Sequence, residues 1–175
     1  MLARYQMFAG YNAWCNERLF DAAALVSNTD YRANRGAFFK SLHGTLNHLL
    51  VGDRIWMRRF TGHGEAPPSL NAILYDDFTQ LRVARRAEDE RISGYIGALT
   101  EGDLAKTIRY RTVVNPQNIE QVLAPALDHF FNHPPVFPRK AIVWNPIAFA
   151  RWAALTRLPE LPLVVRRIRM SPGRP

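Results

Sequence analysis

The sequence predicts an all-α protein: an antiparallel four-helix bundle, with a short β-hairpin or extended segment before the last core helix. Two observations predict this class. Four long segments carry apolar residues at spacings of three and four, the period of an amphipathic helix, and the connections between them are short. One short run of alternating, β-branched residues lies between the third and fourth of these segments.

The first helix is expected over residues 3–26, where aromatic and aliphatic residues recur on one face, and polar residues 27–30 should end it. The second helix is expected from about residue 37 to residue 60. Glycines on either side of His63, followed by two prolines, forbid its continuation.

The third helix is expected to start near residues 76–77 and to end near residue 102, with an almost wholly charged middle that should face solvent. Residues 107–113 alternate and are expected to form a strand or hairpin arm. The fourth helix should run from about Ile119 into His133, with Pro125 kinking it or delaying its start. Trp14 and Trp56 are expected to be core residues rather than base-stacking platforms, because their neighbours are not basic.

Length and composition indicate one folded domain. The chain has 175 residues, 47% hydrophobic and 22% charged, which is typical of a folded protein rather than a disordered one. No apolar run approaches the roughly 18 residues that span a membrane, and the first residues lack the pattern of a signal peptide. We therefore expect a cytoplasmic protein without membrane partners.

The net charge of +8 comes almost entirely from one end of the chain. Residues 1–133 hold 15 Lys and Arg against 14 Asp and Glu, whereas residues 134–175 hold 8 against 1. Eight of the twelve prolines also lie after residue 133, and all five histidines lie at or before it. The two parts are therefore interpreted as different units: a helical bundle over 1–133 and a Pro/Arg-rich basic tail over 134–175.

Three histidines are candidate metal ligands. His129 and His133 are four residues apart, so one helix face carries both imidazoles, and His48 lies in the second expected helix. Two such histidines and a third from a facing helix satisfy a site of three nitrogen donors with an open position. A hydrogen-bonded core or surface role for each histidine remains the alternative.

The residues around these histidines resemble those of the DinB-like proteins, bacterial metal-binding four-helix proteins named for damage-inducible genes. The resemblance is carried by residues 46–50 (Leu-Asn-His-Leu-Leu) with Asp53 and Trp56, and by residues 130–133 (Phe-Phe-Asn-His). It covers about residues 1–133. It implies an up-down-down-up bundle, frequent homodimers, and a divalent metal ion held by three histidines.

By this resemblance His48 and His133 match two ligands, and the third would fall at residue 137, where this chain has Phe137. His129 could replace the missing donor only if the helix rotates or shifts. The resemblance does not distinguish Zn, Ni, Mn or Fe, and with two donors binding should be weak. It suggests a metal-dependent thiol transferase or hydrolase relative that takes a small thiol or another small molecule.

The match stops abruptly after His133. The tail is interpreted as a frameshifted translation of an ordinary family member, as a diverged tail with an altered site, or as an arm selected for nucleic acid or membrane. The coding DNA around codon 133 would decide between them. Three function classes remain open: a metal-binding protein, a non-enzymatic remnant or interaction protein without a competent metal site, and a protein that binds nucleic acid through the tail. The last is the least favoured, because prolines and apolar residues interrupt the basic residues.

Overall fold

The computed structural model describes residues 1–65, 67–113 and 115–132, and in this part the chain is mostly helical with one small antiparallel sheet. The expected tail over 134–175 and the candidate ligand His133 lie outside the described residues. The elements, in chain order, are α1 (Leu2–Ala23), α2 (Asn28–Arg32), α3 (Leu42–Thr61), α4 (Phe78–Ala98), the 3-10 helix η1 (Glu101–Ala105), β1 (Thr107–Arg111), β2 (Asn118–Val122) and α5 (Leu123–Asn132).

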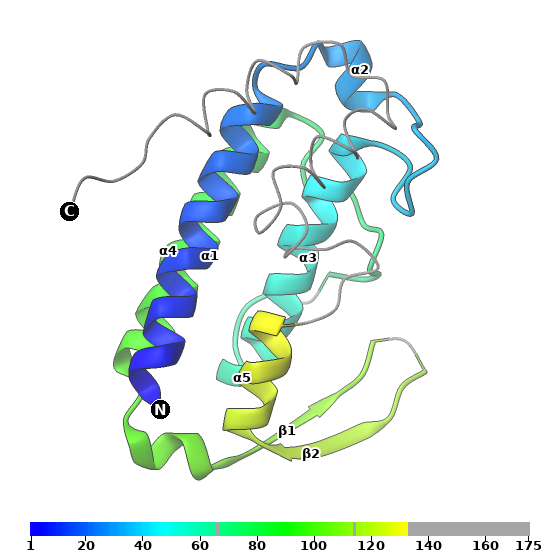
Figure 1. Ribbon diagram of the computed structural model, residues 1–175. Helices are drawn as coiled ribbons and strands as arrows, with labels where there is room; N and C mark the ends of the chain where they lie inside the picture. Colours follow the sequence, from blue (N-terminus) through cyan, green and yellow to red (C-terminus); the bar gives the residue numbers. More distant parts are fainter. Residues whose placement is uncertain (66, 114, 133–175) are drawn as a thin grey trace, which may run out of the picture.

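The connections between the long helices set the direction in which each one runs. In Figure 1, α1 rises from the N-terminus, α3 and α4 both descend, and α5 rises beside the start of α1. The long connection after α3 returns the chain to the level at which α3 began, so that Phe78 at the start of α4 stacks on Phe20 near the end of α1. At the opposite end, the Tyr5 hydroxyl donates to the carbonyl oxygen of Ala124, 3.0 Å away, which joins the first turns of α1 and α5.

Local capping decides where the helices begin and end. The Ser41 side chain accepts from the backbone N–H of Gly44, and Asp77 accepts from that of Gln80, so each satisfies an otherwise unpaired donor of a helix start. Gly62 ends α3 with a φ of 75°, a left-handed conformation that glycine adopts without strain. Because Ser41 caps α3, the helix starts at Leu42, five residues after the start expected near residue 37. Phe38, expected on the apolar side of this helix, is 66% exposed.

Two further expectations need correction. Ser27, expected within a polar stop, caps the short helix α2 by accepting from the backbone N–H of Asp30. Residues 118–122, of which 119–122 were expected to be helical, form β2 and pair with β1 in a register that places Tyr110 opposite Ile119.

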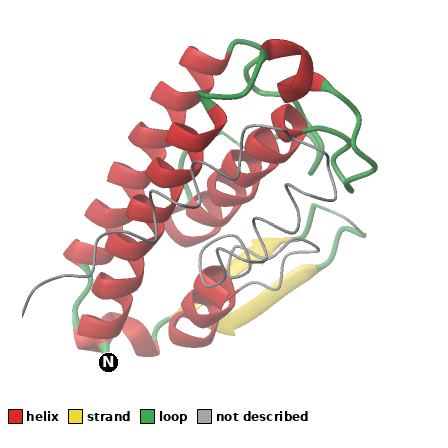
Figure 2. Cartoon of the chain, turned by 45° about the horizontal axis from the view of Figure 1, so that its top comes forward, coloured by secondary structure: helices red, strands yellow, loops and turns green. Residues whose placement is uncertain are grey.

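The hairpin expected before the last helix is confirmed, and it lies beside α5 at one end of the helices (Figure 2). Pro125 falls in the first turn of α5, and this helix starts at Leu123 rather than near Ile119. A delayed start was one of the two effects expected of Pro125.

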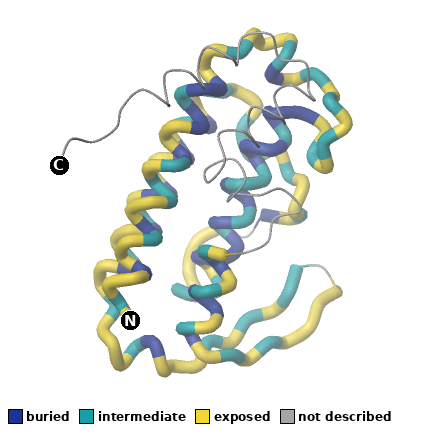
Figure 3. The backbone as a smooth tube through the Cα atoms, in the orientation of Figure 1, coloured by how far each residue is buried: buried dark blue, intermediate teal, exposed yellow. Residues whose placement is uncertain are grey.

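Among the described residues, the apolar core consists of two separate clusters, one toward each end of the helices. One cluster joins the end of α1 to the starts of α3 and α4, with Phe20, Leu46 and Leu81 at its centre. The other joins the start of α1 to the ends of α3 and α4 and to α5, with Tyr5, Ile92 and Phe130. The helix α3 is the most deeply enclosed: in Figure 3 its tube is almost wholly buried or half-buried, whereas α1 and α4 alternate with exposed stretches. In the described part of the chain, no helix combines the length and the apolar character needed to cross a membrane.

Candidate functional site

His48 lies on the second turn of α3, half-buried, with its ring held on two sides. Its Nδ1 lies 2.6 Å from the carbonyl oxygen of Leu70, and its ring stacks on Phe39 with 3.7 Å between centroids. A carbonyl oxygen can only accept, so Nδ1 carries the proton and the lone pair of the neutral ring is on Nε2. Histidine ligands in metal sites are usually oriented by such a hydrogen bond from the other ring nitrogen. The side chain therefore fits the role of a metal ligand.

His129 lies on α5, exposed, and its ring contacts the indole of Trp56 on α3. The two ring centroids are 5.1 Å apart and the planes are tilted by 44°. The structure thus places one candidate histidine on α3 and another on α5. His133 lies outside the described residues. Within residues 1–65, 67–113 and 115–132, no group of three His, Cys, Asp or Glu side chains gathers as a metal site.

A layer of charged side chains separates the two apolar clusters, and the sequence analysis did not predict it. It consists of Asp53 on α3 and Arg85, Glu88 and Asp89 on α4, and Asn16 of α1 completes it; all are buried. Arg85 is 2% exposed, and its Nη1 lies 2.7 Å from Asp53 while its Nη2 lies 2.9 Å from Asp89. Asn16 donates to Asp89 over 2.8 Å, so three helices meet at one ion network.

The environment of this layer shifts its titration. Burial raises the pKa of Asp89, although Arg85 and the hydrogen bond from Asn16 act in the opposite direction. Burial also raises the pKa of Glu88, against the charge of Arg91 at 3.0 Å. For Arg85, burial works to lower the pKa, but Asp53 and Asp89 outweigh it and the pKa is raised. The layer therefore consists of strongly coupled charges held in a desolvated interior.

The expectation that the charged middle of the third helix faces solvent was wrong for Arg85, Glu88 and Asp89, although Arg86 and Glu90 are exposed. Arg85, Glu88 and Asp89 continue the apolar stripe of Leu81 and Ile92 at helical spacing, so they point inward with it. That spacing was visible in the sequence and could have identified them. What the sequence does not reveal is which polar groups on α1 and α3 meet them.

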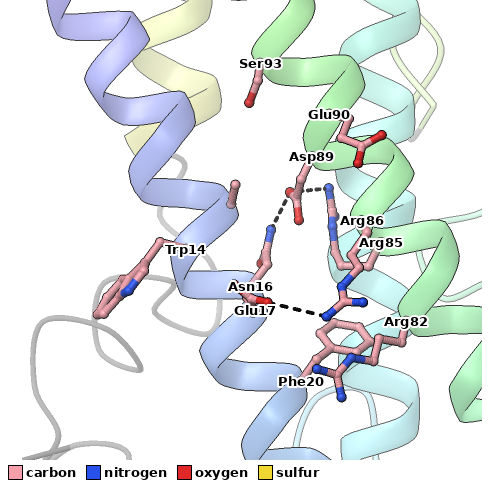
Figure 4. Close-up of a pocket in the computed structure, with 11 residues that line it drawn as sticks. Trp14, Asn16, Glu17, Phe20, Arg82, Arg85, Arg86, Asp89, Glu90 and Ser93 are labelled. Atoms are coloured by element: carbon pink, nitrogen blue, oxygen red, sulfur yellow. Dashed lines mark hydrogen bonds and ion pairs between the residues drawn. The ribbon is translucent and has the colours of Figure 1, made fainter.

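A pocket of 480 Å³ lies between α1 and α4, with this layer at its side. Figure 4 shows Asn16 of α1 pointing toward Asp89 of α4, with Arg85 and Arg86 beside them. The charges that line the pocket balance: three arginines face three acids, with Arg86 paired with Glu17 at 3.4 Å and Arg85 with Asp89, and Arg82 and Glu90 as the remaining cation and anion. The pocket therefore has no excess charge with which to select an ion.

Two adjacent side chains, Trp14 and Cys15, complete the description of α1. Trp14, expected in the core, is 51% exposed and stacks on Tyr11, whereas Trp56 is buried as expected. Cys15 is half-buried, and burial raises the pKa of its thiol to about 11. A thiol with that pKa is protonated at neutral pH, which does not favour a nucleophilic role.

Comparison with known proteins finds one family. The model of the DinB family matches residues 1–134 of the chain. No curated protein and no solved structure matches it.

Proposed function

The chain belongs to the DinB family, and on that premise we propose that it binds a divalent metal ion through His48 on α3 and histidines of the last core helix. His133 is the second proposed ligand. His129, one turn earlier on α5, contacts Trp56, two turns along α3 from His48, so it could supply a third donor only if the helix rotates or shifts. A metal ion bound there would supply Lewis acidity, which lowers the pKa of a water or thiol at an open position.

The observation that carries this proposal is the setting of His48. The Leu70 carbonyl and the Phe39 ring restrict the imidazole to one orientation and one tautomer, which leaves Nε2 as the nitrogen that can coordinate a metal. His43, also on α3, differs: its Nε2 lies 3.1 Å from the carbonyl oxygen of Tyr75 and its ring packs against Tyr31 inside the core. Its role is structural.

The directions of the helices support the finer proposal of an up-down-down-up four-helix bundle. In Figure 1, α3 and α5 run in opposite directions, and the contact between Trp56 and His129 relates their levels. Eight residues from Trp56 toward the start of α3 lead to His48, and eight residues onward from His129 lead to position 137. A regular helix continued from α5 would therefore bring position 137 level with His48, and position 133 about 6 Å below it.

The proposed domain division is a bundle over residues 1–133 and a tail over 134–175, and it accounts for the incomplete ligand set. The family match ends at residue 134, where the charge balance and proline content also change. Homodimer formation and a small thiol substrate stay predictions of the family resemblance.

The first test is a calorimetric titration of the full chain, freed of metal by chelation, with Zn²⁺ and Ni²⁺. We expect weak saturable binding that His48→Ala reduces more than tenfold. The matched control is His63→Ala, because the His63 side chain is exposed in the turn after α3. Equal binding by His48→Ala and the parent would refute the proposed ligand, and an absence of binding by the parent would favour the remnant without a metal site.

The second test repairs the site. Phe137→His alone should restore little, because Pro134, Pro135 and Pro138 each cost about 3 kcal/mol in a helix interior. Replacement of residues 134–140 by a helical segment with histidine at 137 should restore tight binding of Zn²⁺ or Ni²⁺. If this graft binds no better than the parent, the three-histidine site never belonged to this chain.

A further inference from the structure

Arg59 of α3 lies in a corner formed by two aromatic rings. Its guanidinium carbon is 4.5 Å from the centroid of the Trp56 ring and 4.4 Å from that of Tyr110 on β1. The two rings are themselves in contact, with centroids 5.9 Å apart and planes inclined by 62°. The Tyr110 hydroxyl accepts from Gln121 of β2 over 2.8 Å, so the hairpin holds this ring in place.

The corner provides aromatic faces for the cation but no carboxylate. In the part of the chain that the structure describes, Arg59 makes neither an ion pair nor a hydrogen bond, and its buried Nε has no hydrogen-bond partner. Its neighbours along α3 differ. Arg54 lies 2.9 Å from Glu65, and Arg58 donates to the carbonyl oxygen of Gly64 over 2.7 Å.

The side chain is nevertheless partly desolvated. Arg59 as a whole is half-buried, and burial lowers the pKa of its guanidinium. Cation–π contacts contribute about 0.5–2 kcal/mol, but they use the faces of the guanidinium and leave its buried Nε–H donor without a partner. A buried donor without a partner costs about 1–3 kcal/mol. The geometry is therefore that of a cation whose in-plane Nη donors can still bind an anion.

We propose that the corner of Arg59, Trp56 and Tyr110 is a binding site for a small organic carboxylate. The in-plane donors of a guanidinium match the two oxygens of a carboxylate, and the indole and phenol rings offer an apolar wall for the organic part of the ligand. The same indole also contacts the ring of His129 on α5. The site stands on Arg59 and its two rings and does not require a bound metal.

The probe for this site is benzoate, a planar carboxylate with an aromatic body, titrated into the full-length protein with a chelator present and the ionic strength held constant. We expect the side-chain Nε–Hε resonance of Arg59 to shift in a saturable manner in ¹⁵N-resolved NMR spectra, and the Arg58 resonance to shift less. Arg59→Gln should weaken benzoate binding about tenfold or more. Arg58→Gln, on the exposed side of the same turn, should leave it unchanged.

Arg59→Lys separates charge from shape, because an ammonium keeps the charge and loses the planar fork; we expect benzoate affinity between those of the parent and Arg59→Gln. Should Arg59→Gln fail to unfold cooperatively in urea, the parent spectra and Arg59→Lys decide the question. An Arg59 resonance that does not respond to benzoate, or equal affinity in Arg59→Gln, would overturn the proposal. Inorganic phosphate that binds as tightly as benzoate would overturn the assignment to organic carboxylates. Because the chelator removes metal, failure here leaves the proposed metal ligands untouched.

Discussion

Arg85 is buried and Arg59 is half-buried, and the two arginines have very different surroundings. Arg85 lies in the charged layer between the two apolar clusters, within ion-pair distance of Asp53 and Asp89 from two helices. Arg59 lies at the end of α3 near the hairpin, against Trp56 and Tyr110. The first cation is neutralised by the protein itself, and the second is neutralised by no carboxylate in the described residues.

The titration of the two groups reflects this difference. Burial lowers the pKa of Arg59, with Tyr110 acting in the opposite direction, whereas the carboxylates beside Arg85 more than reverse the effect of burial and raise the pKa of Arg85. A paired buried cation stabilises the arrangement that contains it, because the loss of either partner leaves an uncompensated charge. An unpaired one keeps binding capacity at a cost in stability, as sites selected for function often do.

The largest effect is expected from breaking the paired region. Arg85→Met should reduce the free energy of unfolding by about 3–5 kcal/mol, because it leaves the buried carboxylates of Asp53 and Asp89 without their cation. Urea unfolding measured by circular dichroism gives this value. The control is Arg86→Met, which removes an exposed ion pair with Glu17 and should cost less than 1 kcal/mol.

A triple replacement, Asp53→Leu with Arg85→Met and Asp89→Leu, distinguishes charge from packing. It removes all three charges together, so most of the stability lost in Arg85→Met should return. If the triple variant is as unstable as the single one, the layer is held by packing and by Asn16 rather than by charge balance.

The unpaired region should respond much less. Arg59→Met removes a cation–π contact and also a buried donor without a partner, two terms of opposite sign, so we expect a change within about 1 kcal/mol in the same urea experiment. A loss above about 2 kcal/mol would mean that the aromatic contact dominates and that Arg59 is a structural residue.

The smallest expected effect is a pH dependence that marks the charged layer. The folded-state pKa of Glu88 is raised, mainly by burial, with Arg91, Arg85 and Arg54 acting against it and Asp53 in its favour. A raised pKa means that the carboxyl group favours folding when protonated and that this contribution is lost as the pH rises through the raised value. Relative to the parent, Glu88→Gln should therefore gain stability between about pH 4 and pH 7.

An exposed carboxylate provides the control of opposite sign. The pKa of Glu101 is lowered, first by its hydrogen bond from the N-terminal ammonium group, so its contribution is present above its ordinary pKa and is lost as the pH falls. Over the same range, Glu101→Gln should lose stability relative to the parent as the pH rises. A Glu88→Gln difference of this same sign would show that the arginines outweigh burial.

Much of the fold could be predicted from the residues alone, because helix formation depends on local spacing and capping. The apolar period identified the long helices, and the alternation at residues 107–111 identified a strand of the hairpin. Its partner β2 was missed, since residues 118–122 alternate weakly and acquire their conformation by pairing with β1. The start of α3 was missed for a similar reason: Phe38 and Phe39 suit a helix, but the Ser41 cap sets the first turn.

The sequence by itself therefore determined the helical class, the hairpin and the resemblance to the DinB family, and it singled out His48. Only the tertiary structure decided that Arg85 finds two carboxylates, that Arg59 finds two aromatic rings, and that the Leu70 carbonyl fixes the tautomer of His48. The physical reason is distance along the chain. Helical period and capping act within a turn or two, whereas Asp53 and Arg85, or Arg59 and Tyr110, are brought together only by packing of separate elements, and no local pattern specifies the partner of a buried charge.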